Sequence, residues 1–396
     1  MKNYKWTVFF LMRVEDSVLA EATAFLQDLL EVEISDDIAI ILCVNINKYS
    51  IKRFLSGVPG TQAPDGPEKM TTVFYRILSS KNEAGKCHSA VEFIYEKRNF
   101  DITNEDDVSY YFKQFVLRNH DADRYMLFTW DHGNGYGIFT HAYKKASRGL
   151  KTLQMDQLSR AIELAFDTAK IDLMVMMDCD MLTLDTGYAL RDTVKYLVAS
   201  ENALNAVGYN YQAIFKELIK NPDIASEKLA VFVIESYKSK VISEEDKEGA
   251  AVFACNLVDA FFYYEMCKKI FALFLAADPV LMDYIKLAKG GAYIVYPTAP
   301  LIDFGTFVKL LARQTGPESE ITLLCDSLLT EEKQLMPADF IGPVVKETAP
   351  GPDLLPRGFS FYFPLGSNMV GAAPQYLETS FTKAVKMSEL LAKFRQ

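Results

Sequence analysis

Short apolar runs alternate along this chain with longer segments in which apolar residues recur every three or four positions. Residues 6–12 and 38–44 are continuous apolar runs, and residues 18–30 between them have helical spacing. Continuous apolar runs are typical of strands buried on both faces, whereas a half-solvated strand alternates. The order strand, helix, strand therefore predicts an α/β fold with a mostly parallel central sheet and helices on both faces.

The same alternation continues to about residue 200. A glycine- and proline-rich segment at 57–67 predicts a loop, and Thr103 with Asp106 resembles a capping box at the start of a helix. The further elements expected are an antiparallel strand pair at 72–78 and 91–96, helices at 103–118, 153–168 and 188–193, and strands at 124–130, 171–177 and 196–200.

The pattern changes after about residue 245, where long helix-like segments replace the alternation. We therefore expect a core domain over residues 1–245 and a helix-rich C-terminal region over residues 246–396. A late apolar run at 359–363 predicts one more strand, and a return to the core sheet is one option for it.

Composition narrows the class of partner. Half of the 396 residues are hydrophobic, 24% are charged, and the formal net charge is −10. This is the composition of a globular protein with a large core, and its acidity argues against nucleic acid or an anionic membrane as partner. The oligomeric state is left open.

The longest apolar stretch, 252–277, carries four charged residues and is too polar to span a membrane. The first twelve residues resemble a truncated signal peptide, but the charged turn that follows favours a first core strand. The compartment stays open: secreted or periplasmic if a signal has been removed, otherwise cytoplasmic.

Two expected strands end in residues capable of chemistry. The strand at 124–130 runs into His132 and Gly133, and the strand at 171–177 runs into Cys179. Carboxyl ends of parallel strands are where α/β folds place their sites. The 47 residues from His132 to Cys179 accommodate one strand-loop-helix-strand unit, so the two strands can be neighbours. The order histidine then cysteine is also that of caspases, although the caspase pentapeptide is absent.

A thiol and an imidazole placed together can cleave an amide. Cys179 can be the nucleophile, His132 can carry its proton, and the N–H groups of Gly133 and Cys179 can stabilise an oxyanion. A buried cysteine and a turn histidine without chemistry are the alternative, and the residues alone leave both open. No Cys-x-x-Cys pair occurs among the six cysteines, so a zinc site has no support.

Several blocks of the sequence resemble the clostripain family of cysteine peptidases, relatives of caspases, gingipains and legumains. Residues 130–135, Trp-Asp-His-Gly-Asn-Gly, resemble the family's Trp-Asn/Asp-His-Gly-Gly-Gly, and residues 171–190 resemble its cysteine block. Residues 6–12, 198–201 and 358–364 also have family counterparts. The resemblance implies a caspase-like αβα sandwich and a cysteine endopeptidase that works through an acyl-thioester, with His132 and Cys179 as the catalytic dyad.

The resemblance also implies cleavage after Arg or Lys, and self-cleavage between the histidine and cysteine strands. That connection contains four basic residues, Lys144, Lys145, Arg148 and Lys151, which could equally be a solvated loop. One position departs from the family. Met177 stands where the family has the aspartate of the pocket for basic side chains, and a Met floor suits an apolar or uncharged side chain. Asp178 and Glu201 are further candidates for the pocket.

No cofactor is expected. Some family members use calcium, which makes Asp178, Asp180 and Asp185 candidate ligands, but three acids in eight residues are more often solvated or capping groups. The glycines at 133–137 lack the spacing of a phosphate loop. Two competing hypotheses remain: a catalytically silent caspase-like binding module, and an unrelated α/β ligand-binding protein.

Overall fold

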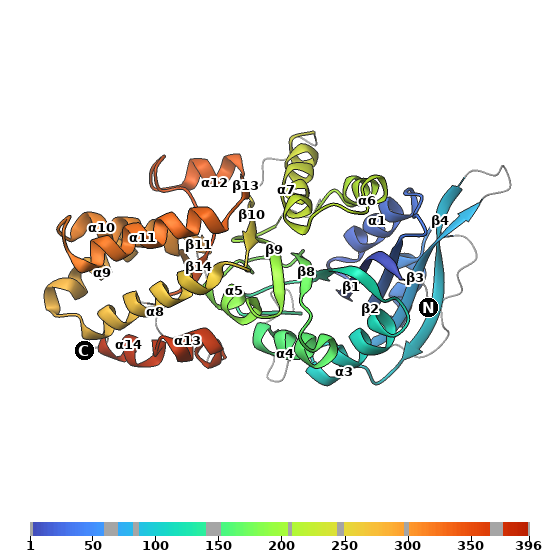
Figure 1. Ribbon diagram of the computed structural model, residues 1–396, viewed down its shortest axis with the longest axis horizontal. Coiled ribbons are helices and arrows are strands. Elements are labelled where there is room, and N and C mark those ends of the chain that lie inside the picture. The colour runs from blue at the N-terminus through green and yellow to red at the C-terminus, as the bar shows by residue number, and fades with distance from the viewer. Residues whose placement is uncertain are drawn as a thin grey trace.

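The computed structural model describes residues 3–58, 70–81, 87–139, 152–204, 208–243, 249–296, 301–364 and 375–394. Its centre is a nine-stranded sheet in the order β13-β10-β9-β8-β5-β1-β2-β3-β4 (Figure 1). The strands of this sheet are β1 (Tyr4–Val14), β2 (Ile38–Asn47), β3 (Met70–Lys81), β4 (Cys87–Lys97), β5 (Ala122–Trp130), β8 (Ile171–Met176), β9 (Val194–Ser200), β10 (Ala251–Asn256) and β13 (Ala338–Ile341).

The five middle strands, β9, β8, β5, β1 and β2, are parallel to one another. Their apolar runs are buried on both faces: every residue from Phe9 to Met12, for example, has no exposed surface. A strand covered on both sides needs apolar residues at successive positions, which is the pattern that predicted it. The expected α/β class with a parallel sheet centre is confirmed.

Helices cover both faces of this sheet, as Figure 1 shows. One face packs against α1 (Leu19–Leu30), α2 (Lys48–Phe54), α6 (Tyr211–Lys220) and α7 (Ser226–Ser243). The other packs against α3 (Glu105–Tyr111), its π-helical continuation (Phe112–Leu117), α4 (Met155–Phe166) and α5 (Leu184–Leu190). The expected helix at 103–118 is therefore present, but Asn104 caps it, not Thr103, because the Asn104 side chain accepts hydrogen bonds from the N–H groups of Asp106 and Asp107.

The antiparallel pairing of β3 with β4 is confirmed. The region after residue 245 differs from expectation in one respect: β10 and β13 extend the central sheet, each antiparallel to its neighbour. The apolar stretch 252–277 is in fact divided between β10 and α8 (Ala260–Ala276). Continuous apolarity does not distinguish a buried strand from a buried helix, which is why the sequence did not reveal this strand.

The late strand does not return to the central sheet. Residues 360–362 form β14 (Ser360–Tyr362), which pairs with β12 (Leu301–Asp303) in a separate sheet of order β11-β12-β14, where β11 is Ile294–Tyr296. Phe361 packs edge-on against Phe271 and Phe304 of the C-terminal helices, 6.0 and 5.2 Å between ring centroids. Burial of its aromatic side chain therefore ties this strand to the C-terminal region.

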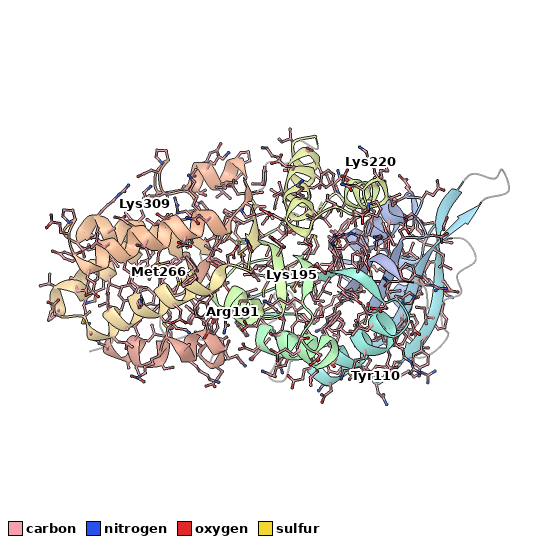
Figure 2. All side chains as sticks on the ribbon, viewed as in Figure 1. Tyr110, Arg191, Lys195, Lys220, Met266 and Lys309 are labelled. Carbon is pink, nitrogen blue, oxygen red and sulfur yellow. The ribbon has the colours of Figure 1, made fainter. Side chains whose placement is uncertain are left out.

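The C-terminal helices are α8, α9 (Pro279–Gly291), α10 (Phe304–Gln314), α11 (Glu320–Leu335), α12 (Pro343–Thr348), α13 (Ser380–Ala384) and α14 (Met387–Lys393), with a 3-10 turn at Tyr376–Glu378. Two short strands, β6 (Gly137–Ile138) and β7 (Leu153–Gln154), form a hairpin-like pair of their own. Figure 2 shows the side chains: Tyr110 lies on α3, and Met266 and Lys309 lie on helices of the C-terminal region. None of the helices in the described ranges is both long and apolar enough to cross a membrane.

Candidate active site

The loops that follow β5 and β8 lie side by side at the carboxyl edge of the central sheet. The two strands pair in register, with Thr129 opposite Met176, and the N–H of Met177 donates to the carbonyl of Thr129 at 3.0 Å. His132 follows β5 by two residues, and Cys179 follows β8 by three. The sheet thus delivers both residues to one edge, as the strand order predicted.

Gly133 shows how closely the two loops meet. A β-carbon placed on Gly133 would lie 2.2 Å from the carbonyl oxygen of Cys179 and 2.7 Å from Cγ of Met181. No real side chain could occupy that space unless the backbone moved. The backbone of the histidine loop therefore lies directly against the backbone of the cysteine loop.

The thiol of Cys179 is partly exposed and lies under the segment that follows β9. The backbone N–H of Leu204 donates to Sγ at 3.3 Å. Burial raises the pKa of Cys179 to about 11, ionised Asp180 and Asp178 add to the rise, and the Leu204 N–H opposes it. In this conformation the thiol is neutral at neutral pH.

His132 is contacted by a residue that the sequence did not single out. Oγ of Ser17, in the turn between β1 and α1, lies 3.3 Å from Nε2 of His132. The carboxyl end of β1 therefore also reaches the site, because β1 is the neighbour of β5 in the sheet. A serine in an acidic turn carries no signal in the sequence that would mark it as a partner of a histidine.

Three aspartates around the dyad are almost completely buried. Burial raises the pKa of Asp178 to about 7 and that of Asp180 to about 7. Burial and the charge of Asp178 raise the pKa of Asp131 well above its ordinary value. Oδ2 of Asp178 accepts a hydrogen bond from Oγ1 of Thr129 at 2.5 Å. Carboxyl groups with raised pKa values thus flank both His132 and Cys179.

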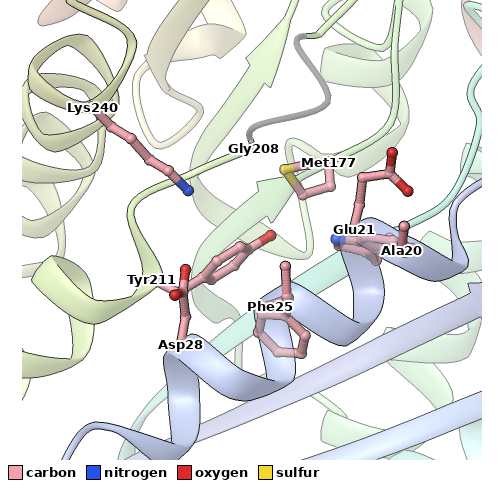
Figure 3. A pocket seen from close by; sticks show the side chains of 10 residues that line it. Ala20, Glu21, Phe25, Asp28, Met177, Gly208, Tyr211 and Lys240 are labelled. Carbon is pink, nitrogen blue, oxygen red and sulfur yellow. The ribbon is translucent and has the colours of Figure 1, made fainter. Parts of the chain in front are cut away.

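A cavity of about 430 Å³ opens on the other side of these strand ends (Figure 3). Trp130, Met177, Gly208 and Tyr211 supply a largely apolar wall, and Phe25 of α1 lies across from them. Gly208, at φ +63, packs so close to Met177 that an added β-carbon would lie 2.8 Å from its Cε. The charged members of the lining are Glu21, Asp28 and Lys240.

These charges come from helices far apart in the sequence, and the sequence reasoning missed them. Figure 3 shows Lys240 of α7 pointing toward the cavity from the side opposite α1. Its Nζ donates to the carbonyl of Tyr209 at 3.3 Å. Burial raises the pKa of Asp28, and the charge of Lys240 opposes that rise. Asp28 and Lys240 therefore offset one another electrostatically.

Only one of the three predicted pocket residues lines this cavity. Met177 does, but Asp178 and Glu201 have no exposed surface and are absent from its wall. Burial and the charge of Asp303 raise the pKa of Glu201 well above its usual range, so it belongs to an interior acid cluster with Asp303 and Glu332. Full burial is at odds with a pocket role for Asp178 and Glu201, because a substrate cannot reach them.

The candidate calcium ligands do not converge. The side chain of Asp185 accepts hydrogen bonds from the hydroxyls of Tyr376, at 2.7 Å, and Thr379, whereas Asp178 is bonded to Thr129. No group of three or more potential metal ligands occurs within the residues that the structure describes. The candidate self-cleavage residues Lys144, Lys145, Arg148 and Lys151 lie outside the described residues.

Comparison with solved structures places this architecture. The secreted cysteine protease iotapain of Bacteroides thetaiotaomicron superposes with a TM-score of 0.67 at 16% identity, over 97% of this chain and 100% of that one. An inactive zymogen protease from Parabacteroides distasonis gives 0.68 at 15% identity, over 97% and 99%. The Bacteroides protease in complex with an irreversible peptide inhibitor gives 0.64 at 14% identity, over 97% and 99%. The fold is thus the caspase-like one of these proteases.

A match to a protein-family model indicates the chemistry, which the fold alone does not. Residues 72–262, which include both His132 and Cys179, match the clostripain family. The class of this protein is therefore cysteine peptidase. The matched segment belongs to the clostripain family, as the sequence resemblance predicted. No protein of curated function matches the chain in sequence.

Proposed function

We propose that the chain is a cysteine endopeptidase in which Cys179 is the nucleophile and His132 carries the proton. The observation that supports this most directly is the contact at Gly133, which puts the histidine loop against the Cys179 backbone. Thiol attack requires the two side chains in one site, and that contact allows it. The matched family segment contains both residues.

The proposed reaction has two halves. His132 takes the thiol proton as Sγ attacks the scissile carbonyl, and the oxyanion receives hydrogen bonds from the N–H groups of Gly133 and Cys179. His132 then protonates the departing amine, which leaves an acyl-thioester. Water activated by His132 hydrolyses the thioester and restores the thiol.

The raised pKa of Cys179 makes the histidine essential to this scheme. A thiol with a pKa of about 11 is almost entirely protonated at neutral pH, so spontaneous thiolate is scarce. The proton must therefore pass to a nearby base during attack. The N–H of Leu204, 3.3 Å from Sγ, favours the thiolate once it forms.

We further propose that the cavity beside Met177 receives the side chain before the scissile bond and prefers apolar or uncharged residues. Trp130, Met177 and Tyr211 offer contact area, and the two carboxylates of the lining, Glu21 and Asp28, come from α1 on the opposite wall. Desolvating a Lys or Arg side chain is costly, and Lys240 both offsets Asp28 and repels an entering cation. Cleavage after Lys144, Lys145, Arg148 or Lys151 would then be unfavourable, so the proposal does not include self-processing there.

The test is cleavage of a peptide library by the purified chain, with Cys179→Ala and His132→Ala as variants. We expect either substitution to reduce turnover by about a thousandfold or more, because the residues act as one unit. The intact mass should stay constant over time. Undiminished cleavage by Cys179→Ala would refute the proposal. A wild-type chain that neither cleaves nor reacts at Cys179 with a thiol-directed peptidyl trap would favour the silent binding module.

A further inference from the structure

Three charged side chains form a row across the carboxyl ends of neighbouring strands. Met12 of β1 pairs with Trp130 of β5, and Thr129 of β5 pairs with Met176 of β8. Arg13, Asp131 and Asp178 therefore occupy equivalent positions one or two residues further on. Neighbouring strands lie about 4.8 Å apart, so Asp131 has Arg13 on one side and Asp178 on the other.

The two carboxyl groups in this row are buried and short of partners. Asp131 is 6% exposed and Asp178 is not exposed at all. Both carboxylate oxygens of Asp131 and Oδ1 of Asp178 lack a hydrogen bond of good geometry. Buried acceptors are almost always satisfied, so three unsatisfied oxygens on two adjacent acids need an explanation. A proton held between the two carboxyl groups would give each an oxygen partner.

The charges around Arg13, Asp131 and Asp178 also favour a proton held between the two acids. Arg13 is the nearby cation, but its guanidinium is shared: NH2 lies 3.1 Å from Glu15 and NH1 donates to the carbonyl of Phe139. One arginine thus serves two acids, Glu15 and Asp131. The other polar and titratable groups facing the pair are the N–H of His132 near Asp131, and Thr129, Tyr209, Tyr211, Cys179 and Asp180 around Asp178 and the thiol.

We propose that Asp131 and Asp178 hold one proton between them, position the histidine and cysteine loops, and lose this proton as the pH rises through neutrality, which hinders thiolate formation at Cys179. Two like charges in a shared buried site repel one another, so one carboxyl keeps its proton up to about neutral pH. The pair carries one negative charge with the proton and two without it. The released proton goes to solvent, and no other bond changes.

Asp178 adjoins Cys179 in sequence and accepts a hydrogen bond from Thr129 of the histidine strand. Its hydrogen bond spans β5 and β8, so it can hold the two loops in register. For its effect on cleavage the proposal rests on the proposed function, but its effect on the thiol does not. The experiment therefore measures the thiol directly.

The rate at which iodoacetamide alkylates Cys179 should be measured from about pH 5 to pH 9 by peptide mass mapping, in wild type and in Asp178→Asn. Asparagine keeps the size and the bond to Thr129 but cannot ionise. We expect the two rates to coincide below about pH 6 and to separate above pH 7. At about pH 8 the variant should react about tenfold faster, because one pKa unit corresponds to a tenfold change in thiolate.

Two further variants keep the test decisive. Asp131→Asn should reproduce the effect, because either acid can be the one that retains the proton, and it covers a failure of Asp178→Asn to fold. Asp172→Asn is the matched control: Asp172 is a buried acid near the amino end of the same strand, where it pairs with Lys195. It should leave the Cys179 profile unchanged.

The outcomes separate the two proposals. An offset between wild type and Asp178→Asn that is equal at all pH values would mean a permanently ionised Asp178 and would overturn the shared proton. Coinciding profiles at every pH would overturn it as well. If the wild type fails to cleave peptides while the profiles diverge above neutrality, the shared proton stands and the endopeptidase proposal falls.

Discussion

The two faces of strands β5 and β8 end in opposite kinds of chemistry. On one face lie Thr129, Asp131 and Asp178, which are buried and polar; on the other lie Trp130 and Met177, which line the cavity. Side chains alternate between faces along a strand, so one residue separates the two environments. A single pair of strands thereby carries buried acids on one side and a wall of the cavity on the other.

The backbone contact between the histidine loop and the cysteine loop supports both faces. Its loss should therefore have the largest effect on cleavage. Gly133→Ala would place a methyl group against the carbonyl oxygen of Cys179. Relieving that clash requires the backbone to move, which is energetically costly in a close-packed site. We expect kcat/KM to fall about a hundredfold, as for a misplacement of about 1 Å in a catalytic group. Steady-state kinetics on the best library peptide measures it. Gly290→Ala, at a glycine with no atom within 4 Å of an added β-carbon, is the control, and an equal loss there would contradict the interpretation.

A substitution at Met177, on the other face, should change which substrate side chain the cavity prefers. Met177→Asp should introduce the carboxylate that the cavity floor lacks, so a basic side chain would gain a counter-charge. We expect the ratio of cleavage after Arg or Lys to cleavage after Leu to rise about tenfold or more, read from a library that varies only that position. Met177→Leu should keep the wild-type ratio. An unchanged preference in Met177→Asp would show that this cavity does not receive that side chain.

The buried acids of the polar face should make the free energy of unfolding depend on pH. Because burial raises the pKa of Asp178 from its ordinary 3.8 to about 7, the folded state holds its proton more tightly than the unfolded state. The stabilisation is complete below about pH 4 and is lost as the pH rises to about 7. We expect Asp178→Asn to remove about 1–3 kcal/mol of this pH dependence.

Urea unfolding at about pH 5 and pH 8 measures this difference. The wild type should lose more free energy of unfolding between the two conditions than Asp178→Asn does. Met177→Leu, on the apolar face, should show the wild-type pH dependence, because it has no titratable group. Identical pH dependence in wild type and Asp178→Asn would mean that Asp178 is solvated.

The sequence singled out His132 and Cys179 as candidates because the evidence for them is local. An apolar run that stops at His132, and another that stops at Cys179, each mark a strand end within a few residues. The charged part of the cavity wall gave no such signal. Asp28 and Lys240 are more than two hundred residues apart, and only the packing of α1 and α7 on the same face of the sheet brings them to one cavity.

Outside the core, the sequence likewise does not determine which sheet a strand joins. The run at 359–363 was predicted to be a strand and is one, but its partner is β12 and not the central sheet. Conversely, β10 was hidden in a long apolar stretch. A strand's own residues fix its tendency to be extended and buried, whereas the sheet it joins depends on which edge its aromatic side chains can pack against.

The sequence by itself determined that buried parallel strands end at His132 and Cys179, because continuous apolar runs between helical segments can be buried only in a covered sheet. It also determined that the side chain at position 177, a methionine, is uncharged. Only the tertiary structure decided that Asp178 and Glu201 are sealed from solvent, and that Asp178 raises the pKa of Asp131. The ionisation of a carboxyl group depends on desolvation and on neighbouring charges, and both come from strands and helices that only the fold brings together.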